Sequence, residues 1–93
     1  MSLLQRGCIK SIQRISHQFT NESSTPDSID INISSVNIDK TIIIMHQYNS
    51  RNNNSIDAVV TFNSNISIHI AQTQGPSQLN FIHFVDIQLV EFY

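Results

Sequence analysis

The sequence of 93 residues contains one cysteine, no tryptophan, two glycines and two prolines, and only 13% of its residues are charged. The single thiol, Cys8, cannot form a disulfide within the chain or a zinc site of the usual multi-cysteine kind. Two glycines, Gly7 and Gly75, leave no glycine-rich loop for phosphate and no G-x-S-x-G nucleophile turn. These absences predict a protein that is not an enzyme and that has no catalytic residues, cofactor or bound metal.

Positive charge is also scarce, since five Lys and Arg stand against seven Asp and Glu for a net charge of −2. The five cations are spread along the chain, so we expect no dense basic face and no nucleic-acid partner. The longest apolar stretches, such as Thr41–Met45, are about a quarter of the roughly 20 residues that a membrane-spanning helix requires. The first residues lack an apolar run behind a basic segment, so a secretory signal is absent or has been removed, and we expect no membrane insertion.

Isoleucine is the abundant residue, with 16 Ile against four Leu. Hydrophobic residues make up 40% of the chain, which is too many for a disordered protein of the low-hydrophobicity kind. β-Branched side chains fit the pleated, half-buried surface of a sheet better than a helix. The composition therefore predicts an all-β protein. We expect a single domain over 1–93, in which residues 1–8 form a short N-terminal extension.

Alternation of apolar and polar residues predicts the strands. Ile29–Ile33 and Ile66–Ile70 are the clearest, because every second residue is Ile, and we expect these isoleucines in the core. Thr41–Tyr48 and Asp57–Asn63 are β-branched or aromatic runs between turn formers, which is typical of more fully buried strands. In Ile9–Phe19 the isoleucines recur at spacing three, as on a helix face, but weak helix formers between them favour a strand.

With Leu79–Phe92, these segments make about six strands, separated by turn-rich connections. Short strands at regular intervals predict a small antiparallel β-sandwich, jelly-roll-like or barrel-like. A hairpin turning at Gln74–Ser77 would make His69 and His83 cross-strand neighbours. Two imidazoles need a third ligand, such as Asp86 or His17, to hold a divalent ion, and strand histidines more often face solvent or bond a neighbour. We therefore predict no metal site.

The last segment, Leu79–Phe92, carries large apolar groups on both faces, whereas a sandwich strand normally shows one face to water. One face must contact something besides the core of the domain. We expect a homo-oligomer, with Phe81, Ile87 and Leu89 as candidate interface residues.

The loops suggest an alternative function. Asn52, Asn53 and Tyr48 are candidate glycan contacts, because amides and hydroxyls match sugar hydroxyls and an aromatic ring covers the apolar patches of a sugar. The alternative hypothesis is a lectin-like attachment module that binds a cell-surface glycan.

The two ends of the chain carry a family resemblance. The segments Ile9–Arg14 (IKSIQR) and Ile87–Phe92 (IQLVEF) resemble the opening and closing strands of small β-sandwich structural proteins in the virions of tailed bacteriophages. Those proteins often begin with an I-K-S-I-Q-R-G type segment, and here Ile15 replaces the glycine. The resemblance implies a non-enzymatic subunit of a tail, fibre or capsid surface, made in the host cytoplasm and located in the virion. It also implies a symmetric homo-oligomer, with a trimer favoured, that contacts other virion proteins.

Overall fold

The computed structural model describes residues 8–49, 56–75 and 81–93. This part of the chain contains no α-helix, and the predicted extension 1–8 lies outside it apart from Cys8. All six predicted strands are confirmed, the ambiguous first one included. They are β1 (Ile9–Asn21), β2 (Ser28–Asn32), β3 (Thr41–Asn49), β4 (Ala58–Ser64), β5 (Ser67–Gln72) and β6 (Phe81–Phe92), with a 3-10 turn η1 (Ile38–Lys40) before β3.

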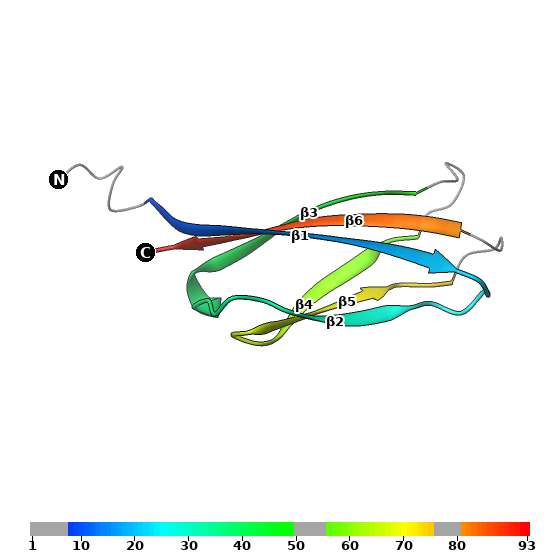
Figure 1. The fold of residues 1–93 in the computed structure, drawn as a ribbon, viewed down its shortest axis with the longest axis horizontal. Helices are drawn as coiled ribbons and strands as arrows, with labels where there is room; N and C mark the ends of the chain where they lie inside the picture. Colours follow the sequence, from blue (N-terminus) through cyan, green and yellow to red (C-terminus); the bar gives the residue numbers. More distant parts are fainter. Residues whose placement is uncertain (1–7, 50–55, 76–80) are drawn as a thin grey trace.

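The strands form two antiparallel sheets of three. Sheet A has the order β1-β6-β3 and sheet B the order β2-β5-β4, and Figure 1 shows them as the upper and lower layers. Only β4 and β5 are consecutive strands of one sheet, so every other connection carries the chain from one layer to the other. The predicted antiparallel sandwich of about six strands is confirmed, with two separate sheets rather than a closed barrel.

The predicted hairpin between β5 and β6 is wrong. His69 on β5 lies opposite Asp30 and Thr61 in sheet B, whereas His83 on β6 lies opposite Phe19 in sheet A. Strand length explains this: β5 has 6 residues and β6 has 12, so a hairpin would leave half of one edge of β6 without backbone partners. In sheet A, β6 instead pairs along its length with β1 on one side and β3 on the other.

The core lies between the inner faces of the sheets. Its fully buried members include Ile68, Ile70, Val85, Ile87 and Leu89, which come from the two central strands, β5 and β6. Partly buried residues of the edge strands pack around them, together with Ile33 just after β2: Ile15, Ile29, Ile31, Ile43, Met45, Val60 and Phe62. The alternating pattern of β2 and β5 therefore marks the core side as expected.

Two burial predictions need correction. Ile66 is exposed, because it lies in the two-residue turn between β4 and β5 rather than in the strand. The segments Thr41–Tyr48 and Asp57–Asn63 are not fully buried either. Their strands, β3 and β4, are edge strands whose residues alternate between partly buried and exposed positions, since nothing described covers their outer faces.

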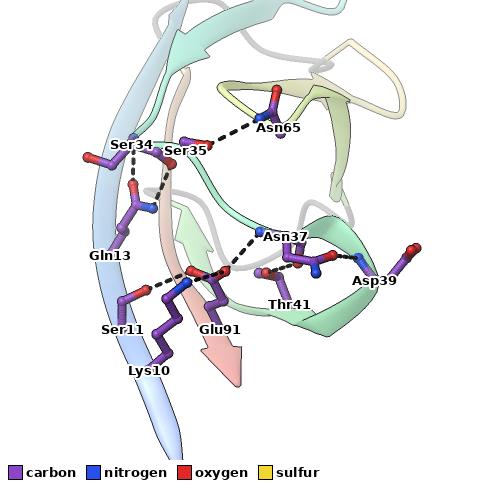
Figure 2. Close-up of polar contacts among 10 residues, drawn as sticks. All are labelled: Lys10, Ser11, Gln13, Ser34, Ser35, Asn37, Asp39, Thr41, Asn65 and Glu91. Atoms are coloured by element: carbon purple, nitrogen blue, oxygen red, sulfur yellow. Dashed lines mark hydrogen bonds and ion pairs between the residues drawn. The ribbon is translucent and has the colours of Figure 1, made fainter. Parts of the chain in front are cut away.

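A buried carboxylate fastens the crossover from β2 to β3 to the end of sheet A (Figure 2). Glu91 accepts a hydrogen bond from the backbone N–H of Asn37 at 2.9 Å and one from Ser11 Oγ at 3.2 Å, and Lys10 Nζ lies 3.8 Å away. The Asn37 bond is the largest cause that holds the pKa of Glu91 below its ordinary value of 4.5. The contribution of this carboxylate to stability is therefore present above pH 4.5 and is lost as pH falls through the lower folded pKa.

Two further contacts fix the connections between layers. The Gln13 amide donates to the carbonyl of Ser34 and accepts from its N–H, both at 2.9 Å, as a neighbouring strand would (Figure 2). At the other end of the sandwich, Gly75 lies against the backbone of Ser24, where any Cβ would clash with the Ser24 carbonyl. Side-chain pairing and one obligatory glycine thus hold loops that cross between the sheets.

The core assignment predicts a sharp difference in the cost of substitution between two isoleucines that are two positions apart in sequence. Ile68 is 0% exposed and Ile66 is 52% exposed. Ile68→Asn should cost on the order of 3–5 kcal/mol, because it removes apolar burial and leaves an amide without partners. The matched change Ile66→Asn should alter the free energy of unfolding by about 0.5 kcal/mol or less. Urea unfolding of both variants measures this, and equal losses would contradict the assigned strand faces.

Candidate interaction surface

The outer face of sheet B is polar. Its outward positions are Ser28, Asp30 and Asn32 on β2, Ser67, His69 and Ala71 on β5, and Val59, Thr61 and Asn63 on β4. The central pair is Asp30 and His69, whose Oδ1 and Nδ1 atoms lie 2.7 Å apart, and Asn63 Nδ2 donates to the same carboxylate. These bonds lower the pKa of Asp30, with the His69 bond as the largest cause. This face is suited to water.

The outer face of sheet A has the opposite character. Its side chains form four cross-strand rows, in the order β1, β6, β3: Ile12, Val90, Ile42; Arg14, Gln88, Ile44; Ser16, Asp86, His46; and Gln18, Phe84, Tyr48. Large apolar residues therefore occupy both ends of this surface, and polar residues cross its middle. We call the whole surface the A face, the first row its isoleucine end and the last row its aromatic end.

The isoleucine end is a continuous apolar patch. Val90 is only 4% exposed although it points away from the core, because Ile12 and Ile42 cover it from either side. Ile12, Ile42 and Ile44 are themselves about half-exposed. At the aromatic end, Tyr48 is half-exposed, and its ring stacks on the ring of Phe84 with 4.9 Å between the ring centroids. Contiguous exposed apolar groups of this kind typically mark a surface that binds a protein.

The middle of the A face is a polar belt with a hollow of about 350 Å³. Its lining includes Arg14, Ser16, His46, Asp86 and Gln88. Ser16 Oγ donates to Asp86 Oδ1 at 2.8 Å. Within the described part of the chain, neither Arg14 nor Asp86 belongs to an ion pair. One cation and one anion thus stand on this face without a partner of opposite charge.

Two of the three predicted interface residues face the core. Ile87 and Leu89 are 1% and 0% exposed and face the core, so they cannot contact a second protein. Phe81 begins β6, but its side chain lies outside what the structure describes. The alternate residues of the same strand point outward: Ile82, Phe84, Asp86, Gln88, Val90 and Phe92. The expectation of apolar groups on both faces of this strand is correct, and only the assignment of the faces is reversed.

A chain of buried polar groups links both sheets at the far end from Glu91. The amides of Asn21 and Gln72 exchange two hydrogen bonds, at 2.7 and 3.0 Å. Gln72 Nε2 also donates to His83 Nδ1 at 3.2 Å, and His83 Nε2 donates to Gln47 Oε1 at 2.8 Å. His83 is completely buried, and burial is the main cause that lowers its pKa, against the opposing charge of Asp57. Its ring is therefore neutral at pH 7.

His69 and His83 are not placed to share a metal ion, because His69 lies on the outer face of sheet B and His83 on the inner face of sheet A. Among the residues that the structure describes, no three His, Cys, Asp or Glu side chains gather as a metal site. Inward polar residues such as Gln47 and Gln72 carry the network, and the sequence analysis missed it. The available signal was a polar side chain at a core-side position of an otherwise apolar strand.

The glycan hypothesis is only partly placed by the structure. Tyr48 is half-exposed at the end of β3, whereas Asn52 and Asn53 lie outside the described residues.

Ranges 8–49, 56–75 and 81–93 hold no helix long and apolar enough to cross a membrane. Comparison of the chain with protein-family models, curated proteins and solved structures returns no match. The function is therefore argued from the surface itself.

The buried imidazole makes stability depend on pH in a defined direction. The folded state keeps His83 neutral, while the unfolded chain binds a proton near the ordinary pKa of 6.5. Stability is therefore full above pH 6.5 and falls as the pH drops through 6.5 towards the lower folded pKa. His17, whose pKa is also lowered by burial, adds an effect of the same sign.

His83→Gln should flatten the loss of melting temperature between pH 7.5 and 5.5, because the titrating group is gone. The control His69→Gln, on the outer face of sheet B, should leave the loss in place. Thermal melts across this range measure both variants. A wild-type protein whose melting temperature rises on acidification over this range would contradict the neutral, buried imidazole.

Proposed function

We propose that this chain is a non-enzymatic structural subunit that acts by protein-protein assembly through the A face. The terminal segments IKSIQR and IQLVEF support a place for that assembly in the virion of a tailed phage, on a tail, fibre or capsid surface. On this proposal the partners are further copies of the chain and neighbouring virion proteins.

The observation that carries the proposal is the contrast between the two outer faces. Four half-exposed side chains share the A face: Ile12, Ile42, Ile44 and Tyr48. The outer face of sheet B holds Val59 as its one large apolar residue. Burying the exposed half of each such side chain contributes about 1 kcal/mol. Four of them therefore supply several kcal/mol per subunit in favour of association.

Low charge supports the same conclusion. The A face carries Arg14 and Asp86 as its only permanently charged residues in the four rows, so little electrostatic repulsion opposes a close contact. Most of its remaining polar groups are amides and hydroxyls, such as Gln88 and Ser16, which are cheaper to desolvate than charges. The surface thus resembles the mixed apolar and polar composition of protein interfaces rather than a solvated face.

The matched pair Ile42→Asn and Val59→Asn tests the proposal. Both residues lie on edge strands, point outward and are 50% and 51% exposed, but they belong to different sheets. We expect Ile42→Asn to shift the protein towards monomer in sedimentation velocity at micromolar concentration, because it places an amide in the contact. Val59→Asn should sediment as the wild type does. Two variants that both sediment as the wild type, or a wild type that is already monomeric, would contradict assembly through the A face.

A lectin-like role is the second proposal, and the half-exposed ring of Tyr48 is the observation that favours it. On the structural proposal, a glycan array probed with the wild type should show no reproducible binding. Binding that is lost in Tyr48→Ala and kept in Ile12→Asn, at the other end of the A face, would favour the attachment module instead.

A further inference from the structure

We infer that the occupant of the A face is a second copy of this chain, stacked face to face about a two-fold axis that crosses the strands close to Ile87. In this arrangement Arg14 of each copy forms an ion pair with the partner's Asp86. The inference rests on the proposed function and adds to it the identity, orientation and charge pairing of the partner.

The outer face of sheet A, which extends beyond the four rows of the A face to Ile82 and Phe92 of β6, is large enough for a specific dimer. Twelve residues of β6 at about 3.3 Å each and three strands about 4.8 Å apart give a surface of roughly 40 by 14 Å. Two such faces bury roughly 1,000 Å² in total, which reaches the lower bound expected of a biological interface. Two sheets that stack in this way keep their strand directions within about 30° of one another.

A two-fold axis along the strands would place like charges together. It would lay β6 on the partner's β6 in the same direction, so Asp86 would meet the partner's Asp86. Arg14 would then lie over the partner's Ile44, because β1 would cover the partner's β3. A carboxylate pair and a guanidinium over an apolar side chain are both unfavourable when desolvated.

An axis across the strands gives the opposite result. The row of Val90 then covers the partner's row of Phe84, and Ile42 lies over the partner's Tyr48, so each apolar end meets the other. Arg14 lies over the partner's Ser16, whose hydroxyl is bonded to Asp86 within 2.8 Å. The hollow at the belt leaves room for the long Arg14 side chain to reach that carboxylate.

The same rows argue against the trimer that the family resemblance implies. Around a three-fold axis a surface must contact a different surface of the next copy, whereas a two-fold axis lets one surface contact itself. The A face would then need a second apolar surface to contact, and the described outer face of sheet B offers polar groups such as Asp30, Asn63 and His69. The A face is complementary to itself through Arg14 and Asp86.

A charge-exchange experiment tests the pairing. Arg14→Asp places an aspartate against the partner's Asp86 at both symmetric positions, and Asp86→Arg places two arginines together. Each variant alone should dimerise with a Kd roughly tenfold weaker or more. An equimolar mixture of the two variants should restore assembly to twice 10.6 kDa, because both pairs then join opposite charges.

The controls Glu22→Arg and Lys40→Asp make the same kinds of charge change at exposed positions outside the four rows of the A face, and they should sediment as the wild type does. Circular dichroism spectra of all variants confirm that they are folded. A mixture that stays monomeric while the wild type dimerises would overturn the pairing, as would an Arg14→Asp variant that dimerises as tightly as the wild type, or a wild-type trimer. A monomeric wild type would instead overturn the proposed function, so the two failures are distinguishable.

Discussion

A two-layer sandwich can cover only one face of each sheet, and this constraint governs the whole structure. The inner faces are satisfied by Ile68, Ile70, Val85 and their neighbours, but no third layer among the described residues covers the outer faces. An outward side chain therefore depends on water, on adjacent strands or on another molecule. Sheet B meets the constraint with polar residues. Sheet A has large apolar residues on its outer face instead. Ile12 and Ile42 cover Val90 from within the same sheet, but they are themselves about half-exposed.

The polar groups inside the sandwich fix the connections rather than fill the core. Glu91 at one end of β6 holds the β2-β3 crossover. At the other end, His83 bonds the amides of Gln47 on β3 and Gln72 on β5, and Gln72 in turn bonds Asn21 on β1. Both ends rely on protonation states that hold at neutral pH, an ionised carboxylate and a neutral imidazole. Acidification weakens both, so the loops that pass between the layers are expected to open before the apolar centre does.

Much of the fold follows from local pattern, while the pairing and the site do not. Period-two alternation locates the strands that begin near Ile29, Ile66 and Leu79, because a half-buried strand imposes that pattern directly. The other three follow from β-branched or aromatic runs between turn formers and from weak helix formers. Alternation cannot decide which face of β6 is inside, since both faces are apolar, and for that reason the sequence alone predicts Ile87 and Leu89 at the interface although they face the core. Nor can a turn-rich segment show whether the chain makes a hairpin or changes layers. The choice depends on the lengths of distant strands, which place β6 between β1 and β3.

The central claim is that one outer face of this sandwich is made for water and the other for a second copy of the chain. Sedimentation equilibrium of the unaltered protein over a range of micromolar concentrations tests it most directly. The account predicts a reversible rise in mass from 10.6 kDa to twice that value, without larger species. A mass of 10.6 kDa at every concentration would contradict it.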